Sequence, residues 1–426
     1  MNILILGSGG REHALAWKIS QSPQCERLYV APGNAGTAQI AENTELDAGN
    51  FGEVEKWVKS NKIDLVIPGP EDPIVSGIYD HFKEKGLLKK HAVLAPDKNS
   101  ARLEGSKVEA KKFMHRHKIP TGAYAAFNKN EIEKAREFVR QHDLPMVIKA
   151  DGLAAGKGVV ICHEQHEAEE ALTGILEDGQ FGKAGQKVVI EEFLQGNEVS
   201  VFALTDGKNL MMLPNACDYK KAGENDTGPN TGGMGAFSPA GANEEFLKKV
   251  DEQVVRPTLR GIEMESGHYH GFLFFGLINV NGNPFVLEYN VRLGDPETQV
   301  ILPRIDEDIL PHFLNAANGE LENRPARQSA DIAATVILAS GGYPGKYEKG
   351  KIISGLEEVD ESLIFHAGTK LDQEEVVTSG GRVLALTSLA PDLEQAVSKS
   401  YNSIHKIHFE GKYYRGDIGK NVTIPS

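Results

Sequence analysis

The sequence has few cysteines and no long apolar run. Cys25, Cys162 and Cys217 are the three cysteines in 426 residues, and no two of them lie at the spacing of zinc ligands. Their odd number argues against a disulfide framework, so we expect a protein of a reducing compartment, the cytoplasm. The apolar run at residues 3–6 is too short for a signal peptide, and no stretch is long enough for a membrane span.

Positive charge is also in short supply. The chain has 46 basic and 60 acidic residues, a net charge of -14. Binding to nucleic acid through phosphate contacts requires a broad basic face, so we expect neither a nucleic-acid nor a membrane partner. The 14 histidines form no HExxH motif, and we expect the pairs at 115 and 117 and at 268 and 270 to lie on the surface.

What the chain does contain is ordinary globular material with many glycines. Hydrophobic residues make up 40% and charged residues 25% of the sequence, which is typical of folded proteins. The length predicts two or three domains with a core that needs no disulfide or metal. The 45 glycines gather into short runs, and these runs indicate where ligands bind.

The first hundred residues alternate short apolar runs with helical segments. This pattern predicts βαβ units and a parallel sheet. Ligands bind at the carboxyl ends of such strands, where the loops at 7–11, 31–36 and 68–73 are expected to meet. The expected strands are residues 2–6, 27–30, 64–67 and 92–95.

The rest of the chain predicts mixed α+β units. Ser106 and Glu109 match a capping box, which starts a helix. Residues 120–190 read as a compact subdomain. A last unit follows residue 325. Further expected elements are strands at 146–149, 187–191, 199–204, 285–289, 332–339 and 383–387, and helices at 130–141, 165–177, 246–254 and 392–406.

The first glycine run, residues 7–12, follows a strand and opens a helix. It differs from the dinucleotide motif GxGxxG because Glu12 replaces the third glycine. The second strand ends without the acid that would hold a ribose, so a nicotinamide site is disfavoured. Backbone N–H groups at the helix start, together with Arg11, favour a small anion such as a phosphate monoester. A tight turn without a ligand remains the alternative.

The second run places Lys149 at the end of a strand and Lys157 between Gly156 and Gly158. Glycines allow backbone amides to approach phosphate oxygens, and lysines supply charge. It is not a P-loop, because Gly158 and a strand follow the lysine. We interpret it as a hairpin flap over phosphates, with a mobile surface hairpin as the alternative.

Two later strands end in polar residues. Glu191 and Glu192, with Glu198 nearby, offer carboxylates for ribose hydroxyls; a solvated strand end is the alternative. Glu288, Asn290 and Arg292 alternate and therefore share one face of a strand. A carboxylate beside an amide oxygen suits Mg2+, and the arginine suits a carboxylate or phosphoryl group. The opposite face is expected to be buried by Phe285, Leu287 and Tyr289, with an exposed edge strand as the alternative.

Taken together, these motifs resemble the ATP-grasp ligases, and within them the phosphoribosylamine–glycine ligase family of purine synthesis. The resemblance extends from Met1 to about Lys420 and includes the loop at 228–235 and the run at 288–297. It implies an α/β and α+β multidomain protein. The implied parts are an N-terminal βαβ substrate-binding domain at 1–104, an ATP-grasp clamp at 105–325 (flap subdomain 120–190, central subdomain 191–325) and a small mixed C-terminal domain at 326–426.

The resemblance also implies an activity, ATP-dependent ligation of glycine to 5-phosphoribosylamine through glycyl phosphate, by a monomer or weak homodimer. Mg2+, or Mn2+ in its place, would assist. The implied ATP contacts are Lys107, Lys149, Gly156, Lys157, Gly158, Glu191, Glu192, Phe193, Leu194 and Glu198. The implied substrate contacts are Gly9, Gly10, Arg11, Asn34, Gly294, Asp295 and Pro296. The implied catalytic residues are Arg292, Lys149 and Asp218, and the implied metal ligands are Glu288 and Asn290.

The chain departs from the family pattern in two places. Asp218 and Lys220 are kept, but Cys217, Tyr219 and Lys221 stand where the family has Gln, His and Arg, and their roles stay open. Many relatives place a second metal-binding carboxylate on the preceding strand, whereas residues 272–276 of this chain contain none. The alternatives are another ATP-grasp enzyme, a nicotinamide dehydrogenase and a nucleotide-binding regulator without catalysis.

Overall fold

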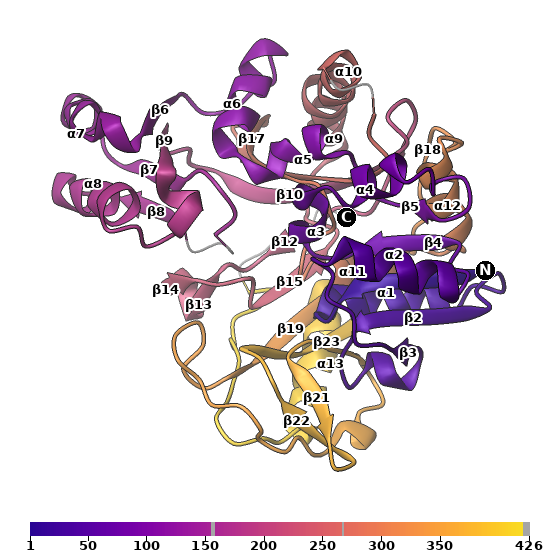
Figure 1. Ribbon diagram of the computed structural model, residues 1–426. Helices are drawn as coiled ribbons and strands as arrows, with labels where there is room; N and C mark the ends of the chain where they lie inside the picture. Colours follow the sequence, from indigo (N-terminus) through magenta and orange to yellow (C-terminus); the bar gives the residue numbers. More distant parts are fainter. Residues whose placement is uncertain (155–157, 266–267, 421–426) are drawn as a thin grey trace.

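The computed structural model describes residues 1–154, 158–265 and 268–420. Two residues predicted to belong to the flap, Gly156 and Lys157, lie outside this part of the chain. The N-terminal sheet packs beside the C-terminal domain, while one lobe, at the left of Figure 1, projects from the rest. Within the described residues, no helix combines the length and apolarity required to cross a bilayer.

The N-terminal unit is the predicted parallel sheet. Its strand order is β3-β2-β1-β4-β5, and every pairing is parallel. The chain crosses from β3 to β4 over the central β1, which makes the loops after β1 and β4 neighbours at the carboxyl edge. The elements are β1 (Asn2–Gly7), α1 (Gly10–Ser20), β2 (Arg27–Pro32), β3 (Glu42–Asn43), α2 (Phe51–Ser60), β4 (Leu65–Pro68), α3 (Glu71–Ser76), α4 (Ile78–Glu84) and β5 (Ala92–Val93).

The turn from β1 into α1 is organised by Glu12. This side chain is 2% exposed, and its carboxylate accepts hydrogen bonds from the Gly9 N–H at 2.6 Å and from the Arg11 Nε at 2.7 Å. A Cβ on Gly69 would lie 2.0 Å from the Glu12 Oε1, and one on Gly7 would lie 2.5 Å from its Cγ. The two strand ends therefore carry glycine because the Glu12 side chain fills the space between them.

The projecting lobe is a four-stranded antiparallel sheet with the order β6-β9-β7-β8. Its buried apolar cluster draws only on residues of the lobe itself. The lobe therefore has a core of its own, separate from the clusters that join the other parts. Its elements are β6 (Tyr124–Asn128), α7 (Ile132–Gln141), β7 (Met146–Ala150), β8 (Val159–Cys162), α8 (Gln165–Leu172) and β9 (Lys187–Glu192).

The central sheet has the order β17-β16-β10-β11-β18. As predicted, Ser106 caps the helix that begins at Lys107 by accepting the Glu109 N–H at 3.2 Å. The strands are β10 (Asn197–Thr205), β11 (Leu210–Met212), β16 (Gly271–Val280), β17 (Asn283–Asn290) and β18 (Arg324–Pro325). The helices are α5 (Lys98–Gly105), α6 (Lys107–Arg116), α9 (Glu244–Val250), α10 (Arg256–Glu265), α11 (Thr298–Ile301) and α12 (Leu310–Asn318).

The predicted buried face of β17 is partly wrong. Val286 and Tyr289 are buried at 0% and 2% exposure, whereas Phe285 and Leu287 are only half-buried. The reason is a bulge: Gly276 pairs with Glu288 while the next residue, Leu277, pairs with Val286. Leu287 is the extra residue, so the inward face changes parity along the strand.

The C-terminal sheet has the order β12-β15-β19-β23-β20, with β24 beside β19. Two of its strands, β12 and β15, come from the middle of the chain, so this sheet crosses the expected boundary at residue 326. Its elements, with two small hairpins, are β12 (Cys217–Asp218), β13 (Lys221–Gly223), β14 (Thr227–Asn230), β15 (Gly235–Ser238), β19 (Ile332–Ser340), β20 (Leu363–His366), β21 (Thr369–Asp372), β22 (Glu375–Thr378), β23 (Arg382–Ala390), α13 (Leu393–Lys406) and β24 (Lys412–Tyr413).

The expectation of surface histidines is confirmed for only one of the four residues, because His117 is half-buried. His115 is exposed, but His268 and His270 are half-buried. Their ring centroids lie 4.3 Å apart, and His268 also lies 4.5 Å from the ring of Tyr79. The chain enters β16 against the N-terminal unit at this point, and these rings form part of that contact.

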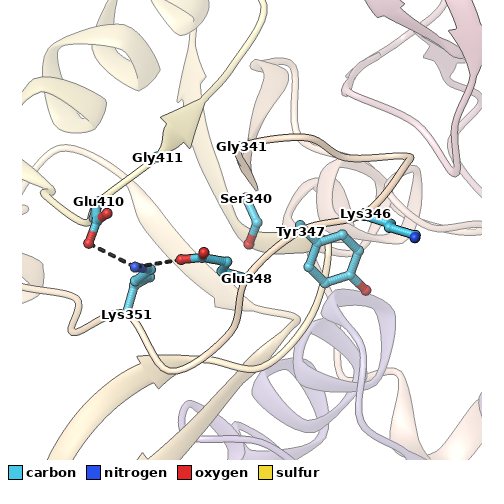
Figure 2. Close-up of a pocket in the computed structure, with 8 residues that line it drawn as sticks. All are labelled: Ser340, Gly341, Lys346, Tyr347, Glu348, Lys351, Glu410 and Gly411. Atoms are coloured by element: carbon cyan, nitrogen blue, oxygen red, sulfur yellow. Dashed lines mark hydrogen bonds and ion pairs between the residues drawn. The ribbon is translucent and has the colours of Figure 1, made fainter.

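A cavity of about 380 Å³ lies in the C-terminal domain (Figure 2). One of its two lysines, Lys351, is 2.8 Å from the carboxylates of both Glu348 and Glu410. No residue that the sequence predicts to contact ATP or substrate lines it. The predicted site residues lie elsewhere, and those of the N-terminal domain lie at the carboxyl edge of its sheet.

The packing of Glu12 can be tested by Gly69→Ala. The added methyl group overlaps the Glu12 carboxylate, so we expect the free energy of unfolding to fall by about 1–3 kcal/mol. The measurement is a denaturation midpoint followed by circular dichroism. Gly52→Ala is the control. Gly52 is exposed on α2, and the heavy atom nearest to an added Cβ would be 3.8 Å away. Alanine also favours helix. Equal midpoints for wild type and Gly69→Ala would contradict the packing described.

Candidate active site

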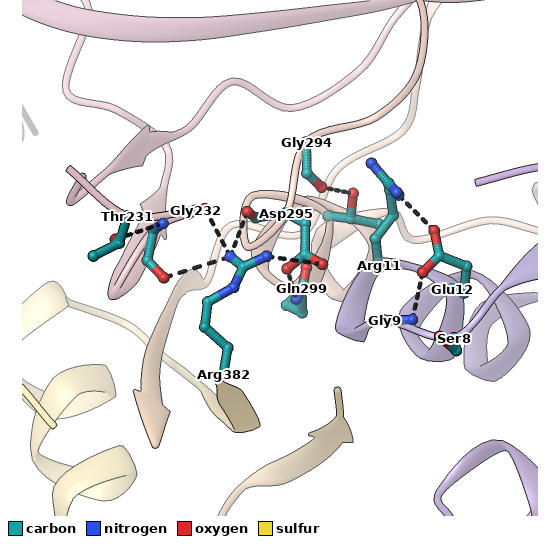
Figure 3. Close-up of polar contacts among 12 residues, drawn as sticks. Ser8, Gly9, Arg11, Glu12, Thr231, Gly232, Gly294, Asp295, Gln299 and Arg382 are labelled. Carbon is teal, nitrogen blue, oxygen red and sulfur yellow. Dashed lines mark hydrogen bonds and ion pairs between the residues drawn. The ribbon is translucent and has the colours of Figure 1, made fainter. Parts of the chain in front are cut away.

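Arg382, at the start of β23, joins two of the predicted motifs (Figure 3). Its Nη1 donates to the carbonyl oxygens of Gly232 and Asp295, each at 2.7 Å. Its Nη2 lies 3.3 Å from the Asp295 carboxylate. The glycine loop before β15 and the turn after β17 are thereby held together by the C-terminal domain. No motif in the sequence assigns a role to Arg382, and the only sign of one is the Gly-Gly-Arg run before the strand.

The turn at residues 294–296 also contacts the N-terminal glycine loop. A Cβ on Gly9 would lie 3.1 Å from the Asp295 Oδ2, and one on Gly10 would lie 2.4 Å from the Gln299 Nε2. The same Gln299 amide donates to the Asp295 Oδ1 at 2.7 Å. Burial opposes ionisation of Asp295, but the charges of Arg382 and Arg11 outweigh it and lower its pKa. Asp295 is therefore a half-buried carboxylate, with its ionised form favoured by two arginines, at the meeting point of three segments.

Several groups predicted to face the amine substrate are engaged inside the protein. Arg11 is 7% exposed; besides Glu12, it donates to the Leu293 carbonyl at 3.1 Å. The Asn34 amide donates to the carbonyl oxygens of Ser8 at 2.9 Å and His366 at 2.8 Å. Its side-chain oxygen accepts two backbone N–H groups of its own loop. These side chains thus fix the shape of the loops after β1 and β2.

The lysines predicted to contact phosphates lie together, although they come from different elements. Lys107, on α6, donates to the Gly152 carbonyl at 3.1 Å. Lys149, at the end of β7, donates to the Leu287 carbonyl at 3.3 Å and lies 3.1 Å from Glu191. Burial lowers the pKa of Lys107, an effect that the negative charge of Glu288 opposes. Two cations therefore converge beside β17.

The predicted adenine segment divides into two parts. Glu191 is 5% exposed, and its carboxylate is taken up by Lys149 and by Lys111, which no motif indicated. Glu192 accepts the Ala123 N–H at 2.7 Å. Phe193 is 36% exposed directly after β9, and an exposed aromatic ring provides a surface on which a flat base can stack. Leu194 is half-buried next to it.

Asp218 belongs to an acidic group around Lys220. The Lys220 ammonium lies 2.7 Å from both the Asp218 and the Glu198 carboxylates. Burial acts to lower the pKa of Lys220, but the two carboxylates outweigh this effect and raise it. Burial raises the pKa of Asp218. Burial and the negative charge of Asp218 together raise the pKa of Glu297 to about 7. Glu297 is 4% exposed and is a further ionisable group that sequence analysis did not assign.

Glu288 and Asn290 fit a divalent metal ion. In the described chain, the Glu288 carboxylate accepts no hydrogen bond and forms no ion pair. Its charge opposes the lowering of the Lys107 pKa by burial and contributes to the raised pKa of Lys220. Asn290 is 7% exposed, and its Nδ2 is buried without a partner. No group of three or more metal-binding side chains occurs among the described residues. Two oxygen donors suit Mg2+, which keeps water and phosphate oxygens as its other ligands.

Arg292 is held by two carboxylates of the N-terminal half. Its Nη2 lies 2.8 Å from Glu104 on α5, and its Nε lies 3.3 Å from Glu71 on α3. Burial raises the pKa of Glu104 to about 7 in spite of the arginine. Burial disfavours the charged form of Arg292 and acts to lower its pKa. The negative charges of Glu104 and Glu71 outweigh the effect of burial, so the pKa of Arg292 is raised. Neither glutamate was assigned from the sequence, although Glu71 lies in the loop expected at the sheet edge.

Two of the positions that depart from the family pattern face the C-terminal segment. The Tyr219 hydroxyl accepts the Gly419 N–H at 2.8 Å, and the Arg415 guanidinium lies 5.0 Å from its ring centre. The Lys221 carbonyl accepts from the same arginine at 3.1 Å. Burial raises the pKa of the Cys217 thiol to about 12, so it stays neutral. Tyr219 and Lys221 therefore brace this loop against the end of the chain.

Three family models match the chain. They describe the N domain, the ATP-grasp (A) domain and the C domain of phosphoribosylglycinamide synthetase, and they match residues 1–104, 105–298 and 333–421. The phosphoribosylamine–glycine ligase of Vibrio parahaemolyticus is 45% identical over 425 residues, which is 98% of each chain.

Solved structures agree with this match. The crystal structure of phosphoribosylamine–glycine ligase from Thermotoga maritima has a TM-score of 0.86 and 38% identity, and the match covers 98% of this chain and all of that one. A biotin carboxylase complex from Campylobacter jejuni, at 15% identity and a TM-score of 0.72, shares the fold over 97% of this chain and 92% of its own. On these grounds, the chain belongs to the phosphoribosylglycinamide synthetase family of ATP-grasp enzymes.

Proposed function

We propose that this chain joins glycine to 5-phosphoribosylamine at the expense of ATP, giving glycinamide ribonucleotide, ADP and phosphate in purine biosynthesis. Its family makes it a carbon–nitrogen ligase. The observation that carries the proposal is the convergence at Asp295 of the N-terminal glycine loop, the loop at 228–235 and the turn after β17. Arg382 holds the last two of these segments together.

The nucleotide part of the proposal rests on the lobe and α6. Lys107 and Lys149 carry charge toward the phosphates, and Gly158 belongs to the predicted flap. Phe193, with Glu192 and Leu194 beside it, offers the adenine surface, while Glu198 is available to a ribose hydroxyl from β10. Lys149 is paired with Glu191, and Glu198 is paired with Lys220. These two ion pairs support the assignment, because they position the side chains before a nucleotide binds.

Glu288 and Asn290 would hold the divalent ion, which we propose to be Mg2+. When bound, this ion would neutralise phosphate oxygens and lower the repulsion between the two anionic reactants. Mn2+ shares the preference for carboxylate and carbonyl oxygens and is the expected substitute. The support from this chain is the Glu288 carboxylate, which no described side chain neutralises, two residues before Asn290 on the same strand.

The chemistry requires no side-chain nucleophile. A glycine carboxylate oxygen attacks the γ-phosphorus of ATP, the bond to ADP breaks, and glycyl phosphate forms. The amine nitrogen of phosphoribosylamine then attacks the glycyl carbonyl carbon, phosphate leaves and the nitrogen loses a proton. Lys149 and Arg292 provide positive charge where both anions meet. Asp218 belongs to the same site, since its charge and that of Glu288 influence one another.

Amine-side binding is proposed for the groups around Asp295. Gly9, Gly10 and Gly294 let the side chains of Asp295, Gln299 and Glu297 approach the backbone there, and Pro296 shapes the turn. Arg11 and Asn34 support this surface from behind through their contacts with Leu293 and Ser8.

The reaction itself is tested by ADP release. With ATP, Mg2+, glycine and freshly generated phosphoribosylamine, we expect turnover that stops when any one component is omitted. Glycine labelled with oxygen-18 in its carboxylate is expected to transfer one labelled oxygen to the released phosphate. Unlabelled phosphate would eliminate the acyl-phosphate route, and turnover without phosphoribosylamine would eliminate the proposed substrate.

The metal assignment is tested by Glu288→Gln. The variant keeps the shape of the side chain but loses its charge, so we expect a lower kcat and at least about a tenfold higher Mg2+ concentration for half-maximal rate. Initial rates across a Mg2+ titration give both quantities. Glu263→Gln, on the exposed face of α10, is the matched control. A Mg2+ curve unchanged from wild type would remove Glu288 as a ligand.

A further inference from the structure

Lys111 is a buried cation to which the proposed reaction assigns no role. It lies on α6, one helical turn after Lys107 and on the same side of the helix. Its side chain is 2% exposed, whereas that of Lys112 beside it is 51% exposed. Lysine is almost never buried unless it is paired, so the contacts of Lys111 show what it does.

All three donors of the Lys111 ammonium group have acceptors. The Nζ lies 2.8 Å from the Glu191 Oε2, donates to the Thr121 Oγ1 at 2.7 Å and lies 3.4 Å from the Gly122 carbonyl. Thr121 in turn donates to the Val286 carbonyl at 2.7 Å. α6 packs against both β9 and β17, so the lysine lies where the lobe joins the central sheet.

The same carboxylate also holds Lys149. The second oxygen of Glu191 lies 3.1 Å from the Lys149 Nζ, so one carboxylate bridges two ammonium groups. Each carboxylate oxygen serves one lysine, and the group of three carries a net positive charge. Burial lowers the pKa of Lys111, and the positive charge of Lys149 lowers it further, which shows that the two cations interact.

We propose that Lys111 is a positioning residue that occupies half of the Glu191 carboxylate and so leaves Lys149 available to a nucleotide phosphate. Without Lys111, the carboxylate would have Lys149 as its only cation. A buried carboxylate requires a compensating cation, so Glu191 would then draw its compensation from Lys149 alone. Lys149 would then turn from the phosphates toward Glu191, and ATP would bind less tightly.

A purely structural role makes a different prediction. If Lys111 only ties Thr121 and the lobe to the central sheet, its removal lowers stability and all kinetic parameters together. If it governs Lys149, the nucleotide parameters change alone. Removal of the Glu191 charge in the same molecule then restores nucleotide binding, because Lys149 no longer has a competing carboxylate.

The test compares Lys111→Met with the double variant Lys111→Met/Glu191→Gln. For Lys111→Met we expect the KM for ATP, and the Kd of a fluorescent ADP analogue, to rise about tenfold, with the KM for glycine unchanged. The double variant is expected to recover most of this loss. Lys112→Met, which removes an exposed ion pair with Glu109, is expected to match wild type.

Two results would overturn the proposal: a wild-type Kd for the ADP analogue in Lys111→Met, or a double variant that binds no better than the single one. Thermal melts accompany each measurement. Should Lys111→Met not fold, Lys111→Gln, which keeps a donor for Thr121, is measured in its place. The inference rests on the proposed function only for the expected KM values, which require turnover. The titration needs neither glycine nor phosphoribosylamine, so loss of the proposed activity in wild type is distinguished from failure of this inference.

Discussion

The site depends on the pairing of buried and half-buried cations with carboxylates. Lys149 is paired with Glu191, Arg292 with Glu104 and Glu71, Arg382 with Asp295, and Lys220 with Asp218 and Glu198. A cation removed from water without a partner loses its proton or destabilises the fold. Anionic substrates must therefore compete with carboxylates already present. In a chain with a net charge of -14, affinity for ATP and a phosphorylated amine arises from local arrangement, not from the overall field.

These pairs also explain why the site needs every part of the molecule. Strand β17 and the turn after it receive contacts from α3 and α5 through Arg292, from α6 and the lobe through the lysines, and from β23 through Arg382. Each contact joins residues far apart in the chain. The bulge at Leu287 in β17 matters for this reason. It changes the face of the strand from which the following side chains project, while Glu288 and Asn290 remain on one common face.

Local patterns were sufficient to predict much of the fold. The alternation of short strands and helices predicted the parallel sheet, and the Ser106 cap predicted the start of α6. They were insufficient where the structure is decided by partners distant in sequence. The bulge in β17, the burial of His268 and His270, and the pairing of β15 with β19 all depend on tertiary contacts that no short window contains. The same is true of Lys111, Glu104 and Arg382, which lie outside the motifs and reach the site only after the chain has folded.

The C-terminal sheet draws β12 and β15 from the middle of the sequence and β19, β23 and β20 from its end. During synthesis, the central part of the chain therefore leaves the ribosome with strand edges whose partners do not yet exist. The glycine loop before β15 and the turn at Asp295 can be fixed only once Arg382 has emerged. A polypeptide that ends before Arg382 thus lacks the side chain that holds these two segments together.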